Sequence, residues 1–247
     1  MIKTAYLTDT GRKRELNEDY VFASEKPVGN LPNLFIVADG MGGHNAGDYA
    51  SRYAIECFLD YIQTSKQDAL IRMVDEGVKY ANKKIIEKAK ENPSMRGMGT
   101  TMVVAFIEDN QLFVGNIGDS RLYLLDREIN QVTEDHSFVE TLVRAGELTR
   151  EEARKHPDKN IITRALGAME NARMDFFEVD LEKGDKILMC TDGLSNMVED
   201  EVLYDITKHT YIGDVVDELI EEAKINGGSD NITVIVIDPF DVEVNRC

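Results

Sequence analysis

The chain has 247 residues, with 28 Lys and Arg residues against 46 Asp and Glu residues, so its formal charge is −18. A body this acidic repels phosphate backbones, which disfavours a nucleic-acid-binding surface. With 43% apolar and 30% charged residues, the composition is that of a globular protein.

The three cysteines, Cys57, Cys190 and Cys247, are too few and too scattered for a disulfide framework or a thiolate metal site. They favour a reducing, cytoplasmic setting. No stretch approaches the roughly 18 consecutive apolar residues of a membrane span, so no membrane association is expected. No linker rich in Pro, Gly or Ser and no repeat divides the chain, which predicts a single domain over residues 1–247.

Nine short runs rich in aliphatic, β-branched and aromatic residues have the length of β-strands. In chain order they cover residues 4–7, 20–23, 34–38, 102–107, 111–114, 121–125, 176–179, 187–190 and 232–237. Asp109-Asn110 separates two of these runs and predicts a hairpin turn.

Three segments, 50–61, 70–89 and 212–223, repeat apolar residues at helical spacing, and each predicts a helix with one buried stripe. Strands occur in adjacent runs and helices in adjacent pairs, which favours an α+β fold with antiparallel sheets over an alternating parallel one. Segment 137–167 is the least strand-like. Its capping box, Thr149 to Glu152, predicts a short polar helix, and we interpret the segment as a flap, the alternative being a helical insertion without a role in a site.

Acidic residues stand at the ends of several predicted strands. Those that follow a strand are Asp39, Asp119 and Asp192, and those that precede one are Glu18, Asp19 and Asp230. Because the end of one strand lies beside the start of its antiparallel neighbour, these acids are expected to share one rim. A single Asp-Gly after a strand is a common turn signal, but several together indicate a site.

Clustered carboxylates repel one another unless a cation neutralises them. Oxygen ligands without nearby Cys or paired His select Mg²⁺ or Mn²⁺ over zinc. Two such ions a few ångströms apart activate a water and clamp a phosphoryl group. The acidic rim therefore points towards metal-dependent chemistry on phosphate esters.

Ordered motifs run through the whole chain. They are Thr8-Asp9-Thr10-Gly11, Arg14-Glu15-Leu16-Asn17-Glu18-Asp19, Val37-Ala38-Asp39-Gly40-Met41-Gly42-Gly43, Gly99-Thr100-Thr101, Gly115-Asn116-Ile117-Gly118-Asp119-Ser120-Arg121, Thr133-Glu134-Asp135-His136-Ser137, Ile162-Thr163-Arg164-Ala165-Leu166-Gly167, Thr191-Asp192-Gly193-Leu194 and Ser229-Asp230-Asn231. On these motifs the chain resembles the metal-dependent protein phosphatase family, type 2C, in its bacterial single-domain form. The resemblance implies two antiparallel sheets packed as a sandwich, with helices on both outer faces in four layers, αββα.

The resemblance also implies a centre of two Mn²⁺ or Mg²⁺ ions and a weaker third. In it Asp39 bridges both ions, Asp192 and Asp230 complete one, and the carbonyl of Gly40 binds the other. Asp19 and Glu18 belong to the shell of the second ion, directly or through water, and Asp119 holds the third ion together with Asp192.

Arg14 matches the family's phosphate-binding arginine, and its planar guanidinium suits a bidentate contact with phosphate oxygens. Animal members carry His directly after the Asp-Gly, where this chain has Met41. His44 is the candidate general acid instead, because its ordinary pKa near 6.5 is suitable, although a surface histidine without a role is the alternative. We expect His136 to be structural, orienting the chain where the flap begins.

The sequence therefore predicts a protein serine/threonine phosphatase acting through a metal-activated water, without a phosphoenzyme. The resemblance implies phosphoprotein substrates and a bacterial Ser/Thr kinase as the opposing enzyme, and a monomer is expected. Two alternatives remain: a catalytically silent phosphoprotein-binding domain on the same fold, and a phosphomonoesterase for small molecules.

Overall fold

The computed structural model of the protein describes residues 1–42 and 46–240. Its strands are β1 (Lys3–Asp9), β2 (Asp19–Ser24), β3 (Leu34–Met41), β4 (Gly99–Thr100), β5 (Met102–Glu108), β6 (Gln111–Ile117), β7 (Arg121–Leu125), β8 (Ile129–Gln131), β9 (Asp175–Asp180), β10 (Lys186–Cys190) and β11 (Ile232–Asp238). Its helices are α1 (Ala46–Thr64), α2 (Leu70–Glu91), the 3₁₀ turn η1 (Pro93–Met95), α3 (Phe138–Arg144), α4 (Arg150–Lys155), α5 (Asp192–Ser195), α6 (Asp200–His209) and α7 (Val215–Ile225).

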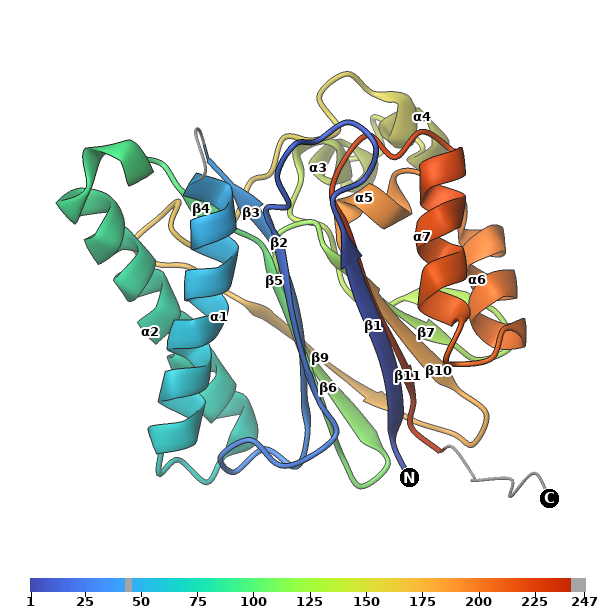
Figure 1. Cartoon of the computed structure of the whole chain (residues 1–247), viewed down its shortest axis with the longest axis horizontal. Helices are drawn as coiled ribbons and strands as arrows, with labels where there is room; N and C mark the ends of the chain where they lie inside the picture. Colours follow the sequence, from blue (N-terminus) through green and yellow to red (C-terminus); the bar gives the residue numbers. More distant parts are fainter. Residues whose placement is uncertain (43–45, 241–247) are drawn as a thin grey trace.

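The strands form two antiparallel sheets that face each other. One sheet has the order β1-β11-β10-β7-β8 and the other has the order β2-β3-β5-β6-β9, with β4 paired to β3. Helices α1 and α2 cover the outer face of the second sheet, and α6 and α7 cover the outer face of the first (Figure 1). The predicted αββα sandwich is confirmed.

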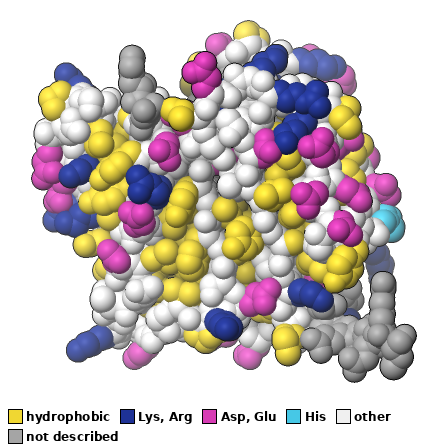
Figure 2. All heavy atoms as spheres, in the orientation of Figure 1, with side chains coloured by type: hydrophobic (Ala, Val, Ile, Leu, Met, Phe, Trp, Pro, Cys, Tyr) yellow, Lys and Arg dark blue, Asp and Glu magenta, His cyan; other side chains and the backbone are white. Residues whose placement is uncertain are grey.

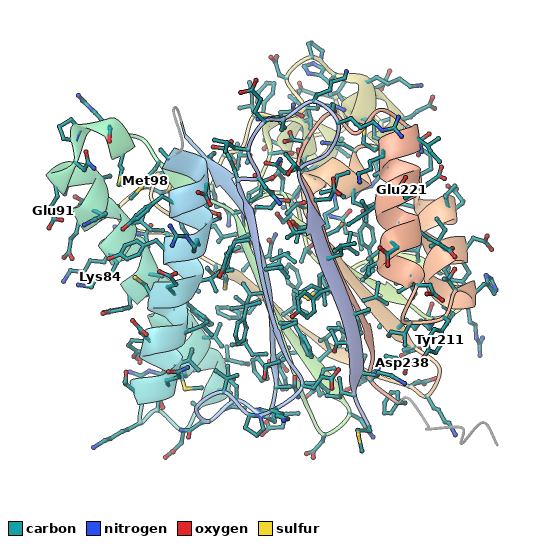
Figure 3. The ribbon with its side chains drawn as sticks, viewed as in Figure 1. Lys84, Glu91, Met98, Tyr211, Glu221 and Asp238 are labelled. Atoms are coloured by element: carbon teal, nitrogen blue, oxygen red, sulfur yellow. The ribbon has the colours of Figure 1, made fainter. Side chains whose placement is uncertain are left out.

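Three apolar cores fill the spaces between the four layers. The central strands are therefore apolar on both faces. In β3, Leu34, Ile36 and Ala38 pack beneath α1 and α2, whereas Phe35 and Val37 point between the sheets. Strand β11 divides its residues in the same way, between the core under α7 and the core between the sheets. Figure 3 shows side chains filling all three interlayer spaces, with Lys84 on α2 and Glu221 on α7 on the outer surface.

The edge strands β1 and β2 are in contact where the two sheets meet. Figure 2 shows apolar side chains along this face, where Tyr6 of β1 and Tyr20 of β2 are among the exposed large residues. The N-terminus in Figure 1 lies at the opposite end of the sandwich from α3 and α4. No helix in residues 1–42 and 46–240 is long and apolar enough to cross a membrane.

Most of the predicted elements are confirmed. All nine predicted strands are present, and the hairpin turn at Asp109 joins β5 to β6 with a positive φ of 54°. The capping box at Thr149 begins α4. The third predicted helix was placed too early, because Tyr211 and Gly213 form a turn and α7 begins only at Val215. The short strands β4 and β8 and the helices α3, α5 and α6 had no clear pattern.

A buried asparagine links the β2–β3 connection to the far end of β5. The Asn33 side chain donates to the carbonyl of Ile107 and accepts from the N–H of Ile107, both at 2.7 Å. Asn33 is only 3% exposed, so water cannot replace these bonds.

We predict that Asn33→Ala lowers the free energy of unfolding by about 2–4 kcal/mol, because two buried backbone groups lose their partners. Urea denaturation followed by circular dichroism measures this change. Asn30→Ala, at an exposed position of the same connection, is the control and should change stability by less than about 0.5 kcal/mol. Equal stability of the two variants would contradict the prediction.

Candidate metal centre

Strand register brings the predicted acids together at one rim of the sandwich. Asp19 begins β2 and is paired directly with Asp39 near the end of β3. Asp192 follows the end of β10, and Asp230 precedes β11, the antiparallel neighbour of β10. Asp119 lies in the turn between β6 and β7. The expected shared rim is therefore present.

Burial and mutual repulsion make these carboxylates difficult to ionise together. Burial, followed by the charges of Asp19, Asp192, Asp119 and Asp230, raises the pKa of Asp39 well above its ordinary value. Burial also raises the pKa of Asp119, with Asp192 as the next cause. For Asp192, burial and then the charge of Asp230 raise the pKa to about 6. The rim thus carries too little positive charge among the described residues to balance its acids.

Asp19 is buried between the two sheets and joins them by hydrogen bonds. Thr191, directly after β10, and Thr233, in β11 of the sheet opposite β2, donate their hydroxyls to Asp19 Oδ2 at 2.8 and 2.7 Å. Burial raises the pKa of Asp19 to about 7, although these two bonds oppose the shift. The other oxygen, Oδ1, is buried without a partner among the described residues.

The β1–β2 loop, which carries Arg14 and Glu18, is held in place by Asn231. The Asn231 side chain donates to the carbonyls of Thr10 and Leu16 at 3.0 and 2.8 Å and accepts from the N–H of Glu18 at 2.8 Å. Asn231 follows Asp230 directly, so one short segment supplies an acid and fixes the loop opposite it.

Arg14 reaches the acidic rim from this loop. Its Nη2 donates to Asp230 Oδ2 at 2.8 Å, and its Nη1 lies 3.9 Å from Glu18 Oε2. The Arg14 side chain as a whole remains 46% exposed. Arg14 is therefore placed beside the acids, as the spacing of the motif implied.

Gly40 and Gly47 are positions where a side chain would not fit. A Cβ at Gly40 would lie 2.1 Å from the carbonyl oxygen of Gly47 and 2.5 Å from that of Glu18, and a Cβ at Gly47 would lie 2.3 Å from Glu18 Oε1. The two glycines let β3, the start of α1 and Glu18 approach one another closely. His44 lies outside the described residues, so its proposed role stays a prediction.

The donor set fits hard divalent cations. It consists of carboxylate and carbonyl oxygens, and two buried carboxylate oxygens, Asp19 Oδ1 and Asp119 Oδ1, have no partner among the described residues. As the side chains stand, no three acidic, His or Cys groups of residues 1–42 and 46–240 converge closely enough to hold one ion. The fit therefore rests on the type of the donors, their burial and their uncompensated charge.

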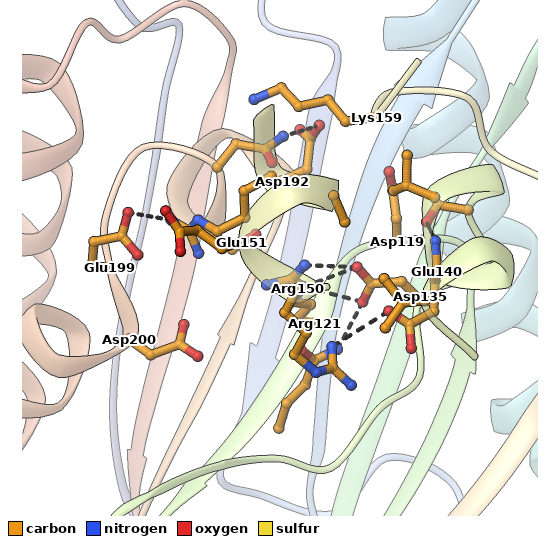
Figure 4. A pocket seen from close by; sticks show the side chains of 18 of the residues that line it. Asp119, Arg121, Asp135, Glu140, Arg150, Glu151, Lys159, Asp192, Glu199 and Asp200 are labelled. Atoms are coloured by element: carbon orange, nitrogen blue, oxygen red, sulfur yellow. Dashed lines mark hydrogen bonds and ion pairs between the residues drawn. The ribbon is translucent and has the colours of Figure 1, made fainter. Parts of the chain in front are cut away.

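A cavity of about 280 Å³ opens beside the acids, between the flap helices α3 and α4 and the start of α6. Asp119, Asp192 and Lys159 line it, and Figure 4 shows Lys159 close to Asp192. Three other cations in its wall are paired with acids: Arg121 with Asp135, Arg150 with Glu140 and Arg154 with Glu199. Lys159 makes no ion pair with the described residues, and its charge opposes the rise that burial causes in the pKa of Asp192.

Sequence reasoning missed the neutral residues that hold the acids. Thr101 accepts from the N–H of Asp39 at 2.9 Å and shares a 2.7 Å hydrogen bond with Ser120. Thr101, Thr191 and Asn231 all stood inside the quoted motifs, but no local pattern distinguishes a threonine that binds a distant carboxylate from one that packs in a strand. Lys159 had no signal at all.

The chain resembles known proteins in both sequence and structure. A sequence profile described as protein phosphatase 2C matches residues 9–220. The chain is 38% identical over 239 residues to the serine/threonine phosphatase stp of Listeria innocua, covering 94% of both chains. It is 40% identical over 243 residues to the protein phosphatase PhpP of Streptococcus pneumoniae, covering 96% of this chain and 97% of PhpP.

Solved structures agree. The serine/threonine phosphatase PstP/Ppp of Mycobacterium tuberculosis superposes with a TM-score of 0.88 at 36% identity, covering 97% of this chain and 99% of that one. The catalytic domain of PstP in complex with two manganese ions gives a TM-score of 0.85 with the same coverage. Stp1 of Staphylococcus aureus gives 0.89 at 33% identity, covering 98% of this chain and 96% of Stp1.

We predict that, in the presence of a chelator, Asp19 makes the folded protein less stable as the pH rises from about 4 to about 7. The folded state holds the Asp19 proton up to about pH 7, whereas an ordinary aspartate releases it near 3.8, so in this window the folded state binds more protons and the free energy of unfolding falls with pH. Urea denaturation in EDTA at several pH values measures it for the wild type and Asp19→Asn. The stability of the wild type relative to the variant should fall by on the order of a few kcal/mol, and a rise would contradict the assignment.

Proposed function

The chain belongs to the protein phosphatase 2C family, and we propose that it hydrolyses phosphoserine and phosphothreonine in proteins at a centre of two Mn²⁺ or Mg²⁺ ions. The observation that carries this proposal is the rim where Asp19, Asp39, Asp192 and Asp230 meet with too little positive charge to balance them. The relatives named serine/threonine phosphatase, and the two manganese ions in one of them, support the same activity and the same metals.

In this proposal Asp39 is shared by both ions, Asp192 and Asp230 hold one of them, and the Gly40 carbonyl, Asp19 and Glu18 serve the other. Asp119, together with Asp192, holds a weaker third ion. When bound, such a pair of ions lowers the pKa of a water and clamps the phosphoryl oxygens for in-line displacement. Asp19, Asp39 and Gly40 lie on strands of one sheet, and Asp119, Asp192 and Asp230 lie close to strand ends, so both sheets would position the ligands of this centre.

Other residues act on the substrate directly. Arg14, half-exposed beside Asp230, binds the phosphate oxygens through its planar donors. Lys159 in the cavity beside Asp192 adds positive charge where a phosphorylated side chain enters. His44, three residues after Met41 in the sequence, protonates the leaving serine or threonine oxygen.

We further propose that residues 1–247 form one catalytic domain with residues 137–167 as its flap, and that the protein is a monomer in the cytoplasm. Its substrates are phosphoproteins produced by a Ser/Thr kinase that it opposes. The presence of all the acids disfavours a silent binding domain on this fold. Phosphate release from phosphothreonine peptides and from small phosphate esters, with and without Mn²⁺, tests the activity and separates a protein phosphatase from a small-molecule phosphatase.

We predict that Asp39→Asn, Asp192→Asn and Asp230→Asn each reduce Mn²⁺-dependent hydrolysis by far more than tenfold, because each removes a negative charge from a shared centre. The fold should survive, since the change relieves repulsion in the metal-free protein. Steady-state kinetics on a phosphothreonine peptide measure the effect, with Asp68→Asn, an exposed acid in the α1–α2 connection, as the matched control. Activity above about a tenth of wild type, a barrier change of only about 1.4 kcal/mol, is too small for a lost ligand.

We predict that Arg14→Ala chiefly raises KM and lowers kcat/KM for phosphopeptides, because the guanidinium binds substrate phosphate. Arg14→Lys should recover only part of the loss, since an ammonium group cannot make the bidentate contact. Manganese binding measured by calorimetry should still give the core ions in both variants. Unchanged kinetics in Arg14→Ala would make Arg14 only the counter-charge of Asp230.

A further inference from the structure

His136 is buried where the Gly118–Asp119 turn, the start of the flap and the start of β9 meet. It is 5% exposed, and the acidic rim makes no direct use of it. Its backbone N–H donates to the carbonyl of Gly118 at 2.9 Å, and its own carbonyl accepts from the N–H of Thr163 at 2.7 Å. One residue therefore connects both ends of the flap segment to the turn that carries Asp119.

The ring of His136 makes two further bonds, which define its tautomer. Nδ1 accepts from the N–H of Gly118 at 3.0 Å. A backbone N–H only donates, so Nδ1 carries no proton, and Nε2 donates to Asp175 Oδ2 at 2.9 Å. Arg164 Nη1 in turn donates to both oxygens of Asp175, at 3.0 and 3.1 Å. Burial lowers the pKa of His136, although Asp175 opposes the shift, which is consistent with the neutral ring.

The Gly118–Asp119 turn is held from the other side as well. Gly118 has a φ of 111°, and a Cβ there would lie 2.5 Å from the side chain of Thr101. The hydroxyls of Thr101 and Ser120 are 2.7 Å apart. Asp119 therefore lies between two residues that are each fixed by a neighbour: Gly118 by His136 and Ser120 by Thr101.

The carboxylate of Asp119 depends on this turn for its position. It is 7% exposed, and its Oδ1 has no hydrogen-bond partner among the described residues. Few side-chain interactions of its own aim it, so a shift of the Gly118 peptide would move the carboxylate with it. Outer groups that orient a ligand in this way commonly change metal affinity or activity 10- to 100-fold when removed.

We infer that His136 is a positioning residue: through the Gly118 N–H→Nδ1 bond it fixes the Asp119 carboxylate relative to the flap, with Asp175 and Arg164 holding the ring. The inference rests on the proposed function in taking Asp119 as the ligand of a third ion. It differs from a merely structural role because the Gly118 bond, and not the bond to Asp175, carries the effect on Asp119.

Two substitutions separate the two ring bonds. In His136→Asn the amide oxygen takes the place of Nδ1 and accepts from Gly118, but the side chain is too short to reach Asp175. In His136→Gln the amide nitrogen takes the place of Nε2 and donates to Asp175, but nothing replaces Nδ1. His209→Asn, with a side chain 70% exposed on α6, is the matched control.

The experiment measures three quantities for each variant and for Asp119→Ala. These are the hydrogen-exchange rate of the Gly118 amide by NMR, the number and affinity of bound Mn²⁺ ions by calorimetry, and kcat and KM for a phosphothreonine peptide. We expect His136→Gln to speed Gly118 exchange at least about tenfold and to weaken only the third ion, about 10- to 100-fold, approaching Asp119→Ala. His136→Asn should stay within about threefold of wild type in all three, while both variants keep the two core ions.

Three results would overturn the inference. One is wild-type exchange and third-ion affinity in His136→Gln. Another is an equal loss in His136→Asn and His136→Gln that follows their unfolding free energies, which would make the role structural. The last is a wild-type protein that binds only two ions. Failure of the proposed function is a separate result, since it would appear as no Mn²⁺-dependent hydrolysis by the wild type, whereas Gly118 exchange and metal binding still decide the role of His136.

Discussion

The structure depends on the crowding of carboxylates at one rim of a β-sandwich. Aspartates that stand far apart in the sequence are brought side by side by antiparallel pairing, most directly where Asp19 and Asp39 face each other across β2 and β3. Burial and repulsion raise the pKa values of several of them. Such an arrangement opposes folding unless cations bind, and it persists because three apolar layers hold the strands that carry the acids.

Neutral hydrogen-bonding residues shape this rim more than charged ones do. Asp19 belongs to one sheet, whereas Thr233 lies in the other sheet and Thr191 directly follows a strand of it, so the acid joins the two sheets at this edge. Asn231 holds the loop that carries Arg14 and Glu18 through hydrogen bonds with the backbone of that loop. Because these groups add no charge, they orient the acids without removing the need for a cation.

His136 joins the start of the flap to the turn that carries Asp119. The flap also makes contacts of its own, such as those of Arg154 with Val198 and Glu199. Short helices such as α3 and α4 have little intrinsic stability, and their position depends on the segment that enters and leaves them. His136, at the start of the flap, bonds to the Gly118 turn, and its carbonyl accepts from the N–H of Thr163 near the end of the flap. A flap anchored in this way is linked to Asp119, one of the acids that line the cavity. In the proposed function a substrate side chain would enter through this cavity.

The sequence by itself determined the strands, the sandwich and the set of acids. Strands buried on both faces appear as continuous apolar runs, and an Asp-Gly or Gly-Asp turn after such runs marks strand ends, so local patterns were sufficient for Asp39, Asp192 and Asp119. Only the tertiary structure decided which neutral residues hold these acids, where α7 begins, that Lys159 lines the cavity beside Asp192, and that His136 holds the Gly118 turn. The physical reason is that these features depend on contacts between segments 18 to over 200 residues apart, and a threonine or histidine has the same local pattern whether or not it meets a distant partner.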